Sequence, residues 1–122
     1  MRGAPLNSRA EIGRAAEDAA AALLRAKGMT VVERNFRAKV GEIDLVARDR
    51  DEIVFVEVRA RASAAFGGAA ASVGGAKRRK LIKAAQLWLL ARGWTGPCRF
   101  DVVALDAGAA THIPAAFDGS GR

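Results

Sequence analysis

Residues 41–61, "GEIDLVARDRDEIVFVEVRAR", contain two segments rich in β-forming residues, joined by a short charged turn. The pattern predicts an antiparallel hairpin made of strands 42–48 and 53–60. In the second segment, apolar side chains occupy both alternating faces, which is typical of a central strand covered on two sides. Asp44 and Glu57 therefore lie inside strands that we expect to be largely buried.

The two acids face each other if Arg48 pairs with Ile53 across the turn. That register places Asp44 directly opposite Glu57, with their Cβ atoms ~5 Å apart, whereas a slip of one residue would separate them onto opposite faces. Two carboxylates at such a distance repel unless a cation lies between them or one is protonated. Arg59, two positions after Glu57, or a metal ion could be that cation.

A metal ion at this place has a specific chemistry. Mg²⁺ favours one or two carboxylates and completes its coordination with water and phosphate oxygens, and it can activate a water molecule for phosphodiester cleavage. Asp44, Glu57 and the nearby Arg59 therefore match the requirements of a metal-dependent nuclease. The alternative is structural: Glu57 pairs with Arg59 and Asp44 caps a backbone group.

The rest of residues 8–106 predicts one α/β domain of order α-β-β-β-α-β, a mixed sheet flanked by helices. The elements around the hairpin are a helix from the Ser8 capping box to Gly28, a strand at 29–37, a glycine-rich mobile loop at 62–75, a helix ending at Gly93 and a strand at 98–105. Residues 107–122 are weakly patterned, and we expect them to form a tail.

The charge of the chain favours a polyanionic partner. Lys and Arg outnumber Asp and Glu by 20 to 13 in 122 residues, and the net charge is +7, which suits nucleic acid better than a membrane surface. One cysteine and one histidine exclude an intramolecular disulfide framework and a Cys/His metal cluster. No segment has the ~20 apolar residues of a membrane-spanning helix, and we expect a cytoplasmic protein without a membrane partner.

Lys77 lies on the same helical stripe as Leu81 and Trp88 and is expected to point inward. It could supply an ammonium group near the acids or contact a phosphate, or its stem could pack while its head reaches water. Other basic residues are candidates for phosphate contacts along a nucleic-acid backbone. The complete predicted nucleic-acid-binding set is Arg37, Lys39, Arg61, Lys77, Arg78 and Lys80. Leu87 and Leu90 face away from Leu81 and either pack under another segment or form a homodimer contact.

The segments "GRAAEDAAAALLRAKG", "GEIDLVARD", "IVFVEVRAR" and "AKRRKLIKAAQLWL" together resemble the YraN-like family of bacterial proteins. That family is similar to the restriction-endonuclease-like PD-(D/E)xK superfamily, especially archaeal Holliday junction resolvases. The resemblance implies a mixed sheet flanked by helices and a structure-selective endonuclease that uses Mg²⁺, or alternatively Mn²⁺, to act on DNA.

Carried over residue by residue, the resemblance assigns Glu17 to the helix glutamate, and Asp44 and Glu57 to the metal-binding acids. The carbonyl of Val58 is implied as a further metal ligand. Arg59 stands where the superfamily usually has lysine; it stays protonated, so it can position phosphate but cannot act as a general base. A nucleic-acid-binding module that keeps the fold without cleaving is therefore the alternative function.

Overall fold

The computed structural model describes residues 9–60, 73–106 and 109–119. The elements in chain order are α1 (Arg9–Ala26), β1 (Thr30–Ala38), β2 (Gly41–Asp49), β3 (Glu52–Ala60), α3 (Gly75–Arg92), β4 (Cys98–Asp106) and β5 (Ala109–Phe117). Every element predicted from the sequence is present, with ends shifted by one or two residues. Most of the predicted glycine-rich loop lies outside the described residues.

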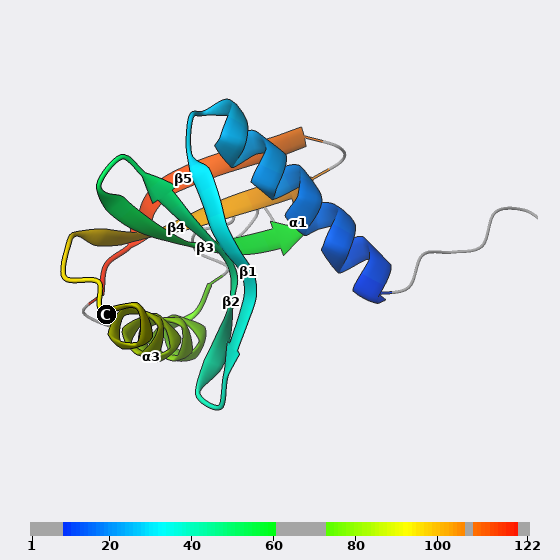
Figure 1. Ribbon diagram of the computed structural model, residues 1–122. Helices are drawn as coiled ribbons and strands as arrows, with labels where there is room; N and C mark the ends of the chain where they lie inside the picture. The colour runs from blue at the N-terminus through cyan, green and yellow to red at the C-terminus, as the bar shows by residue number, and fades with distance from the viewer. Residues whose placement is uncertain (1–8, 61–72, 107–108, 120–122) are drawn as a thin grey trace, which may run out of the picture.

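The five strands form one mixed sheet of order β1-β2-β3-β4-β5. β1, β2 and β3 are successive antiparallel neighbours, whereas β3 and β4 are parallel and are joined by a crossover that contains α3. Figure 1 shows α1 and α3 on opposite sides of this sheet. The α/β fold with a mixed sheet between helices is therefore confirmed.

The register of the central hairpin is the one expected from the sequence. Arg48 pairs with Ile53 and Leu45 pairs with Val56. Ile53 and Phe55 of β3 pack on the α3 side. Val54 and Val56 pack on the α1 side, so β3 is apolar on both faces.

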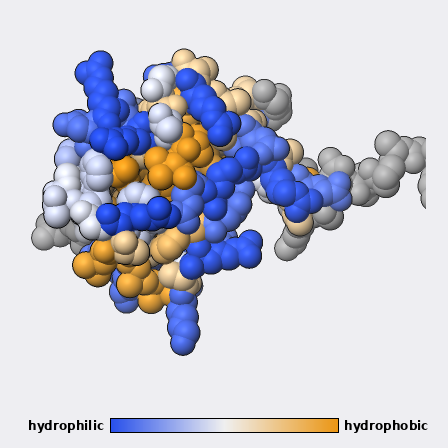
Figure 2. Space-filling model, in the orientation of Figure 1, coloured by the Kyte–Doolittle hydropathy of each residue, from blue (hydrophilic) through white to orange (hydrophobic). Residues whose placement is uncertain are grey.

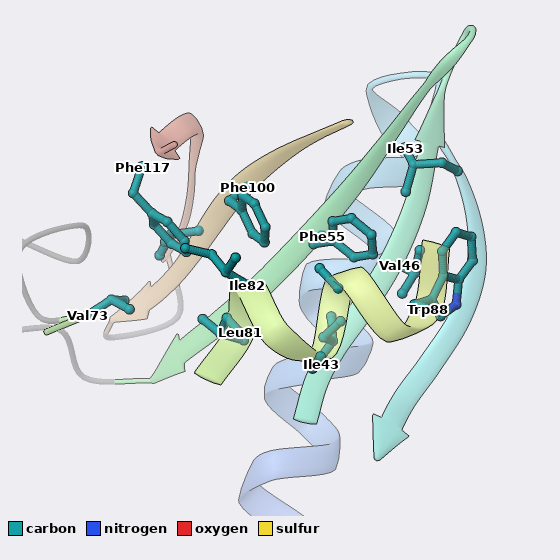
Figure 3. Close-up of a cluster of buried hydrophobic side chains, with 13 residues drawn as sticks. Ile43, Val46, Ile53, Phe55, Val73, Leu81, Ile82, Trp88, Phe100 and Phe117 are labelled. Carbon is teal, nitrogen blue, oxygen red and sulfur yellow. The ribbon is translucent and has the colours of Figure 1, made fainter. Parts of the chain in front are cut away.

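Two hydrophobic cores cover the two faces of the sheet. The α3 core contains Phe55, Trp88 and Phe100 (Figure 3), and the rings of Phe55 and Trp88 meet edge to face with their centroids 5.7 Å apart. Ile43 belongs to this core but Leu45 belongs to the α1 core. The regular alternation that would put Ile43 and Leu45 on one face is thus broken at Asp44.

The sequence pattern did not reveal β5, which pairs antiparallel with β4. Its sequence, "AATHIPAAF", has neither alternation nor a run of β-branched residues, and it contains Pro114, which is tolerated in edge strands. Pairing with β4 therefore determines this strand more than local propensity does.

Asp101 of β4 is fully buried and holds β5 in place. Its carboxylate accepts hydrogen bonds from Arg99 Nε (3.0 Å) and from the backbone N–H of Ala115 (2.9 Å), and it lies 2.7 Å from His112 Nε2. Lys27 Nζ lies 2.9 Å from His112 Nδ1. Because an ammonium group can only donate, Nδ1 accepts and Nε2 carries the proton that is donated to Asp101.

The surface carries an apolar patch over α3, where Leu87 and Leu90 are exposed (Figure 2). These two side chains do not pack under another described segment. The other alternative, a homodimer contact, stays a prediction. Within the described ranges, no helix combines the length and apolar character that crossing a membrane requires.

Candidate active site at the fork between β2 and β3

The central hairpin opens into a fork at Asp44. Backbone pairing between β2 and β3 extends from the turn only to Leu45 and Val56. Beyond this point β2 stays paired with β1, and β3 continues alongside β4. Asp44 Oδ2 accepts a hydrogen bond of 2.8 Å from the backbone N–H of Val58. At this point of β3, a side chain of β2 therefore accepts the hydrogen bond in place of a backbone carbonyl.

Asp44 and Glu57 meet at this fork. Burial raises the pKa of Asp44 to about 8, and a hydrogen bond and charge repulsion from Glu57 act in the same direction. The Val58 N–H and the Lys77 ammonium oppose the rise in this pKa. Burial and the neighbouring Glu57 therefore favour the protonated form of Asp44 when no further cation is present.

Glu57 has an incompletely satisfied carboxylate. Its side chain is 6% exposed, and its Oε2 atom is buried without a hydrogen-bond partner among the described residues. Lys77 Nζ lies 3.5 Å from this oxygen, which makes an ion pair but not a well-directed hydrogen bond. Such a buried oxygen requires an explanation, and an additional cation or water is one.

A cavity of about 210 Å³ opens at the fork. Helix α1 contributes two small residues and Glu17 to its wall, and the strands and α3 contribute the rest. The lining residues are Gly13, Ala16, Glu17, Glu42, Asp44, Glu57, Val58, Ala60 and Lys77. Three of the predicted site acids, from three different elements, therefore reach one cavity.

Glu17 is held by polar contacts from β1. Asn35 Nδ2 donates to Glu17 Oε1 at 3.0 Å, and Arg34 lies 3.6 Å from the same oxygen. Asn35 has a positive φ of 56°, a conformation that asparagine tolerates better than most residues. The sequence pattern gave no sign of this contact, because Asn35 stands inside an otherwise ordinary strand.

Lys77 is the cation at the acids. Of the two expected alternatives, the structure has the one that brings its ammonium group toward Glu57. Arg59 is partly buried, takes part in an interaction of its own, and is not among the described residues that line the cavity. A basic side chain of α3 is thus paired with Glu57.

Gly41 explains how α3 approaches the fork so closely. A Cβ atom at Gly41 would lie 2.9 Å from the backbone carbonyl oxygen of Lys80, which is shorter than any ordinary contact. Glycine at this position lets the first turns of α3 rest on the start of β2. Lys77, one turn before Lys80, is thereby brought over Glu57.

The predicted nucleic-acid-binding residues do not all lie at one place. Lys39 and Lys80 line a second cavity of about 400 Å³, together with Arg79 and Lys83, which the prediction omitted. By contrast, Arg37 lies 3.6 Å from Glu42.

Arg78 has a packing role at the other side of α3. Its Nε donates to the carbonyl of Val73 at 2.8 Å, and its guanidinium lies 5.1 Å from the centroid of the Phe117 ring. Arg61 lies outside the described residues. The cavity and the two residues Arg79 and Lys83 could have been anticipated only from the helical spacing of the basic cluster.

The donors at the fork suit a hard divalent cation. Asp44, Glu57 and the Val58 carbonyl offer oxygen atoms, which Mg²⁺ prefers, and the buried Glu57 Oε2 has no hydrogen-bond partner among the described residues. Over the ranges that the structure describes, no three or more His, Cys, Asp and Glu side chains are grouped to hold a metal. A cation here would therefore complete its coordination with water or substrate.

The fold and the fork define a single-domain α/β protein with paired carboxylates at an opening in a mixed sheet. A family model described as "Uncharacterised protein family UPF0102" matches residues 16–105, and the chain belongs to this family, which is the YraN-like family expected from the sequence.

Relatives named UPF0102 protein match over most of the chain. One from Janthinobacterium sp. (strain Marseille) is 50% identical over 102 residues, covering 84% of this chain and 83% of its own length. One from Cupriavidus metallidurans is 47% identical over 119 residues, covering 97% of this chain and 89% of its own length.

Proposed function

We propose that this protein is a metal-dependent endonuclease that cleaves DNA phosphodiester bonds and selects its substrate by structure more than by sequence. The observation that carries the proposal is the meeting of Asp44, Glu57 and Lys77 in one cavity, with a buried Glu57 oxygen left unpaired by hydrogen bonds among the described residues. Carboxylates with a strongly shifted pKa in a cleft are typical of functional sites. The net charge of +7 agrees with a nucleic-acid substrate in the cytoplasm.

Asp44, Glu57 and the Val58 carbonyl would hold the cation. Mg²⁺ or Mn²⁺ bound there would lower the pKa of a water molecule and offset charge on the scissile phosphate. Lys77 is placed to stabilise negative charge on that phosphate as a compact point charge. Glu17, fixed by Asn35, faces the same cavity and can orient a water molecule. Arg59 stays protonated and would act only by attracting the substrate.

The test is a cleavage assay with labelled junction, flap, duplex and single-stranded DNA, and with RNA, in Mg²⁺, Mn²⁺ or EDTA. Asp44→Asn and Glu57→Gln keep the shape of each side chain, and we expect each to reduce cleavage at least ~100-fold, the size of effect seen when one transition-state contact is removed. Asp51→Asn, in the exposed turn at the other end of the hairpin, is the matched control and should cut like the parent.

If the parent cuts no substrate, or if both site variants cut as well as the parent, the endonuclease proposal fails. Thermal melting of each variant in EDTA separates loss of chemistry from loss of fold.

A second function, nucleic-acid binding without cleavage, is favoured by one observation: only two of the site acids converge closely, and within the described ranges no larger ligand group is present. Salt-dependent binding that survives Asp44→Asn and Glu57→Gln, without cutting by the parent, is the outcome that supports this function.

A further inference from the structure

The first turns of α3 and the β1–β2 turn enclose a cavity of about 400 Å³ with a markedly basic wall. Its lining residues are Lys39, Val40, Ala76, Arg79, Lys80 and Lys83. Four of these six residues are cationic and none is acidic. Figure 1 shows the β1–β2 turn extending beside α3, and hydrophilic side chains project from this part of the surface (Figure 2).

Among the described residues, these four cations lack the acidic partners that other basic residues have. Arg34, Arg92 and Arg99 each form ion pairs with carboxylates. No ion pair within the described part of the chain involves Lys39, Arg79, Lys80 or Lys83. Like charges gathered without counterions repel one another, so this cavity is prepared for an anion.

The first turn of α3 adds no acidic compensation. It contains no acidic residue, and its N-cap, Gly74, makes no side-chain capping hydrogen bond. An anionic ligand at the cavity would relieve the mutual repulsion of the four cations.

The basic cavity lies beside the acid cavity along the same helix. Lys77 borders the acid cavity, and Lys80 and Lys83 border the basic one. Lys83 follows Lys77 by two Lys-to-Lys steps of three residues each, which corresponds to a rise of ~9 Å along the helix axis. A DNA strand that passes Lys77 could therefore reach Lys80 and Lys83 with neighbouring phosphates.

We infer that the basic cavity binds backbone phosphates of the DNA strand that neighbour the phosphate lying at Asp44 and Glu57. The path of the strand toward the acids rests on the proposed function, whereas phosphate binding by the cavity does not. Because Lys39, Arg79, Lys80 and Lys83 would contact phosphates and not bases, the cavity adds affinity without sequence preference.

The test compares a double variant, Arg79→Gln with Lys83→Gln, with a control that removes the same charge elsewhere. The control is Arg25→Gln with Arg50→Gln, two exposed residues on α1 and in the β2–β3 turn. Binding of labelled duplexes of two unrelated sequences is measured by fluorescence anisotropy in EDTA over a range of salt concentrations. EDTA prevents cleavage, so the measurement is independent of nuclease activity.

We expect the Arg79/Lys83 variant to lose at least ~10-fold in affinity for both duplexes, and its salt slope to fall by about 2, since each neutralised phosphate contributes ~0.9. The control should change less than ~3-fold. Equal binding by the parent and the Arg79/Lys83 variant, or equal losses in both double variants, overturns the inference.

Two further results separate the possible sources of phosphate and the two proposals. Binding of inorganic phosphate by the parent, without binding of either duplex, would overturn the assignment to a DNA strand. If the parent never cuts DNA but the Arg79/Lys83 variant loses duplex binding, phosphate binding by the basic cavity is supported and the endonuclease proposal fails. If the parent cuts DNA, and the Arg79/Lys83 variant cuts and binds duplex as well as the parent, the endonuclease proposal is supported and the inference about the basic cavity fails.

Discussion

The central hairpin carries a pair of acids at each end, and the two pairs are treated differently. At the turn, Asp49 is paired with Glu52 in the register. Arg99 Nη1 lies 3.1 Å from the Asp49 carboxylate and 2.9 Å from the Glu52 carboxylate. At the fork, the Lys77 ammonium lies 3.5 Å from one Glu57 oxygen, and Asp44 accepts a hydrogen bond from the Val58 N–H.

The difference separates an acid pair that is compensated within the protein from one whose charge is compensated only in part. Although burial opposes it, hydrogen bonds to its three carboxylates raise the pKa of Arg99 above its ordinary value. The arginine is thus firmly charged, and the acids around it are satisfied. At the fork, burial and the neighbouring Glu57 raise the pKa of Asp44, and the Lys77 ammonium offsets this rise only in part.

The largest effect on stability is expected at the turn end of the hairpin, where Arg99 compensates the acids. Arg99→Met should lower the free energy of unfolding by about 3–5 kcal/mol, because the fully buried Asp101 carboxylate loses the cation that compensates its charge. Urea denaturation monitored by circular dichroism measures this. Adding Asp101→Asn to Arg99→Met should recover part of the loss. A single variant as stable as the parent would contradict the structural role of Arg99.

At the fork, a pH-dependent effect of intermediate size is expected from Asp44. Its pKa is about 8 in the folded protein, against 3.8 for an unperturbed aspartate, so the native state holds a proton that the unfolded chain releases. Stability contributed by this proton is present at low pH and is lost as pH rises toward 8. In EDTA, the loss between pH 5 and pH 8 should be on the order of 2–4 kcal/mol, at ~1.4 kcal/mol per pH unit.

Asp44→Asn should flatten this pH dependence and be more stable than the parent at pH 8. Asp51→Asn, in the exposed turn, serves as the control and should keep the slope of the parent. Equal slopes for the parent and Asp44→Asn in urea titrations would show that the acid pair does not hold a proton.

The smallest effect on stability is expected from Lys77. Because its side chain is 40% exposed and its ion pair is long at 3.5 Å, Lys77→Met should change the free energy of unfolding at pH 7 by less than about 1 kcal/mol. It should also move the pH midpoint of Asp44 upward, since the ammonium lowers the pKa of this acid. If Lys77→Met lowered the free energy of unfolding as much as Arg99→Met, the contrast between the acid pairs at the two ends of the hairpin would be wrong.

The fold was predictable because its elements carry local signals. The hairpin of β2 and β3 follows from alternation and a charged turn, and its register follows from the short connection. Helix α3 ends at Gly93, whose positive φ of 63° is the conformation that glycine favours. By contrast, β5 depends on Asp101 and on pairing with β4, and neither is visible in "AATHIPAAF".

The site was predictable in part. The alternation of side chains and the register of the hairpin allowed Asp44 and Glu57 to be paired from the sequence. We expected them to be direct partners in a continuous ladder of backbone hydrogen bonds. In the structure the ladder ends before them, because Asp44 hydrogen-bonds Val58. The helical stripe of Leu81 and Trp88 indicated that Lys77 points inward. Whether its ammonium group reaches the acids depended on the packing of α3 against Gly41, a contact between segments far apart in the sequence.

The burial of Asp101 has a consequence for how the chain matures. Its carboxylate is completed by His112 and by the backbone of Ala115, which are synthesised after β4. Until these residues emerge from the ribosome, β4 presents an unpaired edge with an acid that only Arg99 can neutralise. We therefore expect a nascent chain that ends before residue 109 to be prone to misassociation and to degradation, even though both acids of the fork are already made.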